Sequence, residues 1–247
     1  MQLLKNRYYF GGVDLLEVAN QFGTPLYVYD AETISRQYKK LNEAFAGVDL
    51  KIKYACKALN NINIIKYLKS LGAGLDTVSI EEVEIGLKAG YKPAEILFTP
   101  NCVDFSEIKK AVEYGVTINI DNISILEQFG HDYGSKVECC LRLNPHIMAG
   151  GNSHISVGHI DSKFGISIYQ LPLIDRIVKN NKIKVFCCQN MLFKRANRIL
   201  LAKKRYAWVS SASVEADFDH SEDTLLFSIF NFVPVSTSIK NVRLLTF

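Results

Sequence analysis

Lys57 is the residue of this sequence that is best placed to do covalent chemistry. It ends a run of small and apolar residues, predicted to be a β-strand over residues 51–57, and a turn follows at Asn60. In parallel α/β folds, catalytic side chains gather at the carboxyl ends of the strands. A lysine that is desolvated there has a lowered pKa and can form a Schiff base with a carbonyl compound. The alternative is a surface lysine that extends from a strand end into solvent.

Two other groups of reactive side chains favour structural readings. His146, His154 and His159 cluster in a loop, but their spacing suits no common metal motif, so we predict no metal site. The six cysteines include two vicinal pairs and no CxxC spacing, which predicts reduced thiols in a reducing compartment. They are Cys56, Cys102, Cys139, Cys140, Cys187 and Cys188.

The elements that must position Lys57 alternate in type from about residue 24 to residue 186. Predicted strands cover residues 26–29, 51–57, 74–78, 96–99, 116–120, 137–143 and 183–188. Predicted helices cover residues 31–45, 62–71, 80–89, 105–113, 124–129 and 171–179, with Asp30, Asn61 and Ser79 as N-caps. Such alternation predicts a parallel sheet covered by helices, either a (β/α)8 barrel or a doubly wound sheet.

Composition and charge restrict the class of protein. The 247 residues are 48% hydrophobic and 22% charged, which is typical of a globular protein. No run approaches the roughly 18 apolar residues of a membrane span, and the N-terminus lacks the order of a signal peptide, so we expect a cytoplasmic protein. Eight of the 29 basic and five of the 25 acidic residues lie in residues 186–247. The basic run at 193–205 has no nucleic-acid motif and no clean amphipathic stripe, so we expect neither a nucleic-acid nor a membrane partner.

The residues around Lys57 resemble a known motif. Tyr54-Ala55-Cys56-Lys57-Ala58, followed by Asn60, is similar to the cofactor-lysine motif of the barrel-type decarboxylases that use pyridoxal phosphate. Other segments resemble this family in the same order, and together they cover about residues 20–185. They are Gly23-Thr24-Pro25-Leu26-Tyr27-Val28-Tyr29-Asp30, Gly72-Ala73-Gly74-Leu75-Asp76-Thr77-Val78-Ser79 with Glu82, Arg142-Leu143-Asn144-Pro145, and Ser162-Lys163-Phe164-Gly165-Ile166. Within the family, the diaminopimelate decarboxylases are the most similar branch.

The resemblance implies roles for five residues. Lys57 would be the Schiff-base lysine and would later transfer a proton. Asp76 would lie near pyridoxal phosphate at the mouth of the second strand, with Glu82 behind it, and Arg142 would lie beside the cofactor ring. Asn101 ends the third strand and could line the pocket. Each also has a structural reading: Asp76 as a turn cap, Glu82 as part of a capping box with Ser79, and Arg142 as an ion-pair partner.

The resemblance also implies a fold and a reaction. We expect a partial (β/α)8 barrel, about the first five to six βα units, over residues 1–185, and a tail outside the family over residues 186–247. The implied reaction is pyridoxal-phosphate-dependent decarboxylation of meso-diaminopimelate to L-lysine. Alternatives are a related substrate, namely carboxynorspermidine, ornithine or arginine, or a non-catalytic remnant. The intact family forms homodimers and acts on small amino acids.

The family pattern ends at about Val185. A His-Thr-Gly-Ser segment, a glycine-rich phosphate loop and a Glu-Pro-Gly-Arg segment are expected beyond it, but this sequence continues Phe186-Cys187-Cys188-Gln189-Asn190. We interpret the change as a frameshift or truncation, and translation of the other two reading frames downstream tests the frameshift. The expected consequences are two unpaired sheet edges, weak phosphate binding and weak or absent activity.

Overall fold

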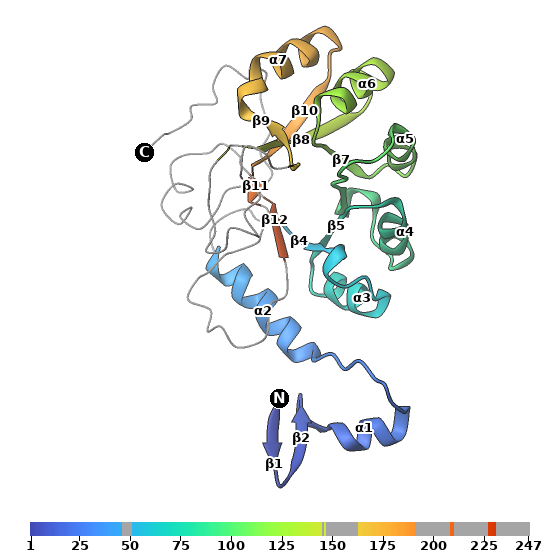
Figure 1. The fold of residues 1–247 in the computed structure, drawn as a ribbon, viewed down its shortest axis with the longest axis vertical. Helices are drawn as coiled ribbons and strands as arrows, with labels where there is room; N and C mark the ends of the chain where they lie inside the picture. The colour runs from blue at the N-terminus through green and yellow to red at the C-terminus, as the bar shows by residue number, and fades with distance from the viewer. Residues whose placement is uncertain (46–50, 145, 147–162, 191–207, 210–226, 231–247) are drawn as a thin grey trace. The chain divides into compact units, whose positions relative to one another are not determined.

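The computed structural model describes residues 1–45, 51–144, 146, 163–190, 208–209 and 227–230 (Figure 1). The described residues belong to two compact units. One is residues 1–45, and the other contains the remaining described residues. Each unit is described separately below.

The N-terminal unit consists of a small antiparallel sheet and two helices. Strands β1 (Gln2–Leu4), β2 (Arg7–Phe10) and β3 (Val13–Asp14) pair in sequence order. Helices α1 (Leu15–Phe22) and α2 (Ala31–Ala44) follow. None of the three strands belongs to the alternating pattern, so the sequence did not predict them.

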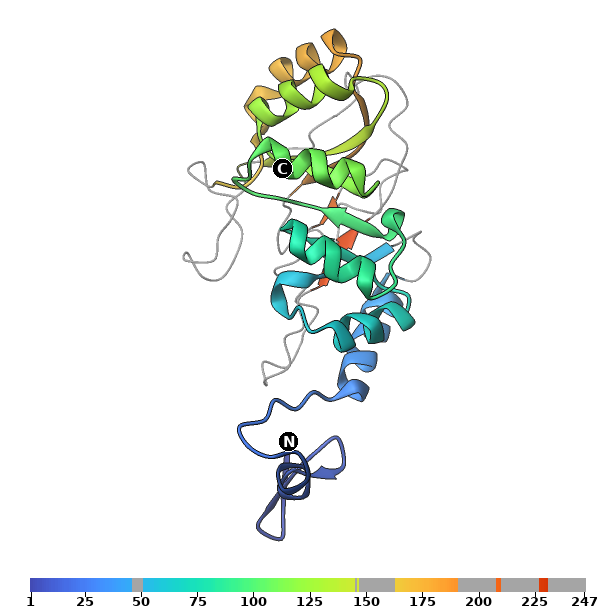
Figure 2. The same ribbon diagram turned by 90° about the vertical axis from the view of Figure 1, so that its right-hand side faces the viewer.

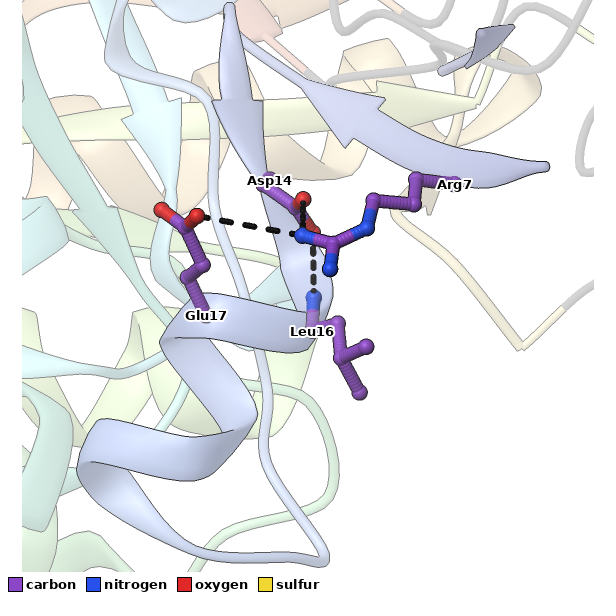
Figure 3. A network of polar contacts seen from close by, with 4 residues as sticks. All are labelled: Arg7, Asp14, Leu16 and Glu17. Carbon is purple, nitrogen blue, oxygen red and sulfur yellow. Dashed lines mark hydrogen bonds and ion pairs between the residues drawn. The ribbon is translucent and has the colours of Figure 1, made fainter. Parts of the chain in front are cut away.

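Asp14 fixes the start of α1. One of its carboxylate oxygens accepts a hydrogen bond from the Leu16 backbone N–H at 2.8 Å, which satisfies an otherwise unpaired donor of the first turn. The other oxygen accepts from Arg7 Nη1 at 2.6 Å, and the same nitrogen lies 3.8 Å from a Glu17 carboxylate oxygen (Figure 3). The Asp14 cap therefore also joins β2 to the beginning of α1.

The predicted strand at residues 26–29 is wrong. These residues lie between α1 and α2 in no regular element, and none of the described strands pairs with them. The Tyr27 side chain is 86% exposed. Alternating apolar residues fit a strand, but a strand forms only where a neighbour supplies the hydrogen bonds.

The second unit is built on six parallel strands, with helices between successive strands. The strands are β4 (Lys51–Ala55), β5 (Gly74–Thr77), β6 (Ile96–Phe98), β7 (Thr117–Ile120), β8 (Glu138–Asn144) and β10 (Lys184–Asn190). The helices are α3 (Ile62–Ser70), α4 (Ile80–Lys88), α5 (Phe105–Glu113), α6 (Ile123–Tyr133) and α7 (Leu171–Asn180). The helices form one layer outside the curved sheet (Figures 1 and 2). This arrangement confirms the expected partial (β/α)8 barrel.

The two faces of the sheet bury different side chains. Leu75 and Ile96 pair across β5 and β6, and both face Gly86 of α4, where an added Cβ would lie 2.6 Å from Leu75 Cδ2. Because side chains alternate along a strand, Asp76 and Leu97, the next pair in register, face the inside of the barrel. Leu97 packs there in a buried apolar cluster.

Residues of the tail complete the sheet. Strand β12 (Phe227–Phe230) pairs antiparallel with β4, and β11 (Trp208–Val209) pairs with both β10 and β12. The expectation of two unpaired sheet edges is therefore wrong. An edge strand presents a row of backbone donors and acceptors, which a segment of any sequence can pair with.

The helix caps follow the sequence closely. Asp30, Asn61 and Ser79 each accept a hydrogen bond from a backbone N–H in the first turn of α2, α3 and α4, as predicted. No helix in the described part of the chain is long and apolar enough to cross a membrane.

Among the cysteines whose side chains the structure describes, the expectation of reduced thiols is wrong for Cys140. Cys140 is disulfide-bonded, whereas Cys56, Cys102 and Cys139 are free. Sequence spacing compares a cysteine only with its neighbours along the chain. A disulfide instead depends on which cysteines the fold brings together.

Candidate active site

Lys57 lies at the mouth of the barrel, just beyond β4. It is the middle residue of a short 3₁₀ helix, Cys56–Ala58, and its side chain is exposed. The preceding Cys56 is fully buried, and burial, helped by the charges of Glu82 and Asp76, raises the pKa of its thiol to about 12. The site therefore presents the lysine amine and keeps the neighbouring thiol protonated.

The charge of Asp76 influences the pKa of several groups at this mouth, namely Cys56, Glu82 and Arg142. It is buried near the end of β5, and its Oδ1 accepts a hydrogen bond from Thr99 Oγ1 at 2.7 Å. Asn119 Nδ2 of β7 donates in turn to Thr99 Oγ1 at 3.4 Å. These contacts join the ends of three adjacent strands, so the carboxylate has a fixed position.

Glu82 lies close enough to Lys57 for the two charges to interact. Burial raises the pKa of the Glu82 carboxyl, while the Val78 backbone N–H and the Lys57 ammonium oppose the shift. Its Oε2 accepts a hydrogen bond from Val78 N at 2.8 Å, and its own N–H donates to Ser79 Oγ at 3.3 Å. The capping role and a role beside Lys57 are therefore compatible.

Arg142 brings a buried positive charge to the same mouth. Burial lowers the pKa of its guanidinium, and the carboxylates of Asp76 and Asp121 oppose that shift. The guanidinium carbon lies 4.7 Å from the centre of the Phe164 ring. A buried cation needs such partners, because an uncompensated charge in the interior is costly.

The structure brings four of the five predicted residues into one electrostatic group. The charge of Lys57 lowers the pKa of Glu82. The charge of Asp76 raises the pKa of both Glu82 and Arg142. Asn101 instead donates a hydrogen bond to Asp121. The charge of Asp121, just beyond β7, raises the pKa of Arg142. Asn101 thus belongs to the same mouth but contacts its second carboxylate.

Sequence reasoning missed three polar residues that the site contains. Thr99, Asn119 and Asp121 are all buried. Their signal was available, because each is a polar residue within or just beyond the end of an apolar strand of a parallel sheet.

His146 has a structural environment at the end of β8. Its Nε2 lies 2.7 Å from Ser167 Oγ, and its ring stacks on Tyr169 with centroids 5.2 Å apart. These contacts join the end of β8 to the segment after β9 (Ile166–Ser167). His154 and His159 lie outside the described residues. Within the described part of the chain, no cluster of three His, Cys, Asp or Glu side chains is arranged to hold a metal ion.

Lys53 lies within β4, and its side chain is buried. Its side chain passes Gly74, where an added Cβ would lie 2.9 Å from Lys53 Cγ, and its Nζ donates to the Glu95 carbonyl at 2.8 Å. Burial lowers the pKa of Lys53 to about 8, against the attraction of Asp76. Lys53 within β4 is thus buried, whereas Lys57, just beyond the strand, is exposed at the mouth.

The Lys53→Met chain tests this burial through the pH dependence of stability. The folded pKa lies below the unfolded value of 10.5, so the unfolded chain binds more protons between about pH 8 and 10.5. Lys53 therefore makes the free energy of unfolding rise with pH across that window. We expect urea titrations of wild type to show this contribution and those of Lys53→Met to lack it. Identical pH slopes in the two chains would contradict the assignment.

The fold and the mouth together define a barrel protein with an exposed lysine amine near buried carboxylates and a guanidinium. The chain belongs to the pyridoxal-dependent decarboxylase family, matching the model of its pyridoxal binding domain over residues 31–189.

Named relatives agree with this assignment. The diaminopimelate decarboxylase of Methanothermobacter thermautotrophicus is 36% identical over 175 residues, which are 70% of this chain and 41% of the relative. A crystal structure of the Helicobacter pylori diaminopimelate decarboxylase with L-lysine is 29% identical, with a TM-score of 0.66, over 73% of this chain and 47% of that one. The lysine/ornithine decarboxylase of Vibrio vulnificus with putrescine has a TM-score of 0.59 and 28% identity, over 71% and 44%. The chain thus spans less than half the length of these relatives.

The donor set at the mouth fits pyridoxal phosphate. An aldehyde needs an accessible amine, and Lys57 supplies one. A ring with ionisable groups needs fixed charges of both signs, and Asp76 and Arg142 supply them from buried positions.

Proposed function

We propose that this chain binds pyridoxal phosphate at Lys57 and uses it to decarboxylate an amino acid, with meso-diaminopimelate as the substrate. The observation that supports this most is the placement of an exposed Lys57 beside Glu82, with Asp76 and Arg142 buried at the same mouth. Family membership supports the cofactor, and the exposed amine at the mouth supports Lys57 as the residue that would hold it.

The work is divided between cofactor and protein. When bound, pyridoxal phosphate supplies the conjugated ring that takes up the electron pair left as carbon dioxide departs. Lys57 Nζ would hold the cofactor and later carry a proton. Glu82 and Asp76 would place carboxylates near the cofactor, and Arg142 would hold negative charge beside its ring.

The relatives support the choice of substrate. Diaminopimelate decarboxylases recur among both sequence relatives and similar structures. The Vibrio vulnificus lysine/ornithine decarboxylase is a similar structure with another substrate class. Meso-diaminopimelate is therefore our first choice, and ornithine, arginine and carboxynorspermidine are the alternatives.

A second candidate function is cofactor binding without turnover. Phe186 of β10 packs against Leu97 and Cys140, on the inner side of the sheet. It begins the segment that stands where the family carries His-Thr-Gly-Ser. An apolar side chain there supplies no polar group to a bound cofactor, which supports weak or absent turnover.

Carbon dioxide release separates these candidates. The purified chain is mixed with pyridoxal phosphate and with meso-diaminopimelate, ornithine, arginine or carboxynorspermidine in turn. We expect a visible absorbance band, and release of carbon dioxide with L-lysine only from meso-diaminopimelate. A band without release in any mixture would support the second candidate. Faster release from another amino acid would replace the substrate, and absence of the band would contradict cofactor binding.

A further inference from the structure

Hydrogen bonds from Asn101 join Asp121 to a segment of the mouth that is far from it in sequence. It follows β7, and its Oδ2 accepts a hydrogen bond from Asn101 Nδ2 at 2.6 Å. The same amide nitrogen donates to the Lys163 carbonyl oxygen at 3.1 Å. One amide thus ties the loop after β6 to the carboxylate after β7 and to the segment before β9.

The segment that Asn101 holds lies against Arg142. Phe164 follows Lys163 directly, and its ring centre is 4.7 Å from the Arg142 guanidinium carbon. Gly165, with φ +79°, fits closely on β8, since an added Cβ would lie 3.0 Å from Asn144 N and 3.1 Å from the Arg142 carbonyl oxygen. The Phe164 ring is therefore positioned from both sides, by the Asn101 hydrogen bond and by the contact of Gly165.

Asp121 and Arg142 also interact through their opposite charges. Asp121 is buried, and burial raises the pKa of its carboxyl, while the Asn101 hydrogen bond and the Arg142 charge oppose the shift. Arg142 interacts with the carboxylates of Asp76 and Asp121, which come from two different strands. A carboxylate is buried at this position only because a cation and a donor compensate it.

From these contacts we propose that Asp121 is a positioning residue that, with Asn101, holds Arg142 at the mouth of the barrel. Asp76 attracts the guanidinium from one strand. Asp121 attracts it from another, and the Asn101 amide keeps the Phe164 ring packed against its face. The proposal rests on the proposed function in one respect, because the purpose of fixing Arg142 is to present its charge to pyridoxal phosphate.

Two substitutions separate the charge from the hydrogen bond. Asp121→Asn removes the charge and keeps an acceptor for the Asn101 amide. Asn101→Ala keeps the carboxylate and removes both hydrogen bonds. Asp132→Asn is the matched control, because it makes the same acid-to-amide change on the outer helix α6, where Asp132 pairs with Lys109.

The first measurement does not use the cofactor. The full chain is treated with phenylglyoxal, and the modification rate of Arg142 is followed by peptide mass spectrometry, with urea titration as a check on folding. We expect both variants to raise that rate about tenfold, the usual size of a lost charge-assisted contact, and Asp132→Asn to leave it unchanged. Unchanged rates in both variants would overturn the proposal. If Asp121→Asn fails to fold, Asn101→Ala, whose side chain is partly exposed, decides alone.

The second measurement uses pyridoxal phosphate itself. We expect both variants to weaken its binding about fivefold to tenfold and to shift its absorbance band, because the ring would lose a fixed charge. A purely structural role would lower the urea midpoint and leave the band where it is, which would overturn the positioning role. If wild type binds no cofactor, the proposed function fails, and the phenylglyoxal rates still decide whether Asp121 positions Arg142.

Discussion

The Lys57→Ala chain is expected to form no visible absorbance band with pyridoxal phosphate and to bind it at least about 100-fold more weakly than wild type. The reason is that an accessible amine is the group that bonds to the aldehyde. Without it, the charges of Asp76 and Arg142 remain but hold the cofactor only by non-covalent contacts. Absorbance titration of both chains with pyridoxal phosphate measures the difference.

Lys51→Ala is the matched control for this change. Lys51 begins β4 and is exposed, so its loss removes the same charge from the end of the strand that is opposite to Lys57. We expect its titration curve to match that of wild type. Equal weakening by the two substitutions would mean that charge alone attracts the cofactor, and a full band in Lys57→Ala would exclude Lys57 as the attachment point.

Gly165→Ala is expected to destabilise the chain by about 3 kcal/mol, because strain and collision add at this position. Its φ of +79° suits glycine, and the three atoms nearest to an added Cβ, at 3.0 to 3.1 Å, all belong to the backbone of β8. A backbone strand cannot move aside as a flexible side chain can. Urea unfolding followed by far-ultraviolet circular dichroism gives the change in the free energy of unfolding.

Gly90→Ala isolates the cost of the backbone conformation. Gly90 has φ +91° at the end of α4, and no atom lies within 4 Å of the position of an added Cβ. Its substitution should cost about 1 kcal/mol, from the left-handed conformation alone. If the two substitutions cost the same, Gly165 is not packed against β8 as described, and the position of Phe164 beside Arg142 is in doubt.

Local sequence signals predicted most of the barrel. Residues 105–113 were predicted as a helix, and α5 has those bounds. Asp30, Asn61 and Ser79 were predicted as caps, and each caps its helix. These predictions succeed because capping and helical periodicity depend on residues within one turn of each other. The strand at residues 26–29 failed because strand pairing depends on a partner that the local pattern cannot reveal.

The candidate site was predictable in its reactive residue and less so in its surroundings. Lys57 stands in a recognisable motif, whereas Thr99 and Asp121 acquire their meaning only when adjacent strand ends meet at one edge of the sheet. Thr99 lies 2.7 Å from a residue 23 positions earlier, and Asn101 contacts a carbonyl 62 positions later. The pairing of β12 with β4 is of the same kind, since it joins the tail to the first strand of the barrel.

Mapping the attachment point of pyridoxal phosphate is the most direct test of the proposed site. The full chain is saturated with the cofactor, reduced with borohydride, digested and analysed by mass spectrometry. Burial lowers the pKa of Lys53 to about 8, so Lys53, within the strand that precedes Lys57, is its chemical competitor. We predict that the reduced cofactor is found on Lys57. Label concentrated on Lys53, or spread over the exposed lysines without preference for Lys57, would contradict the proposed site.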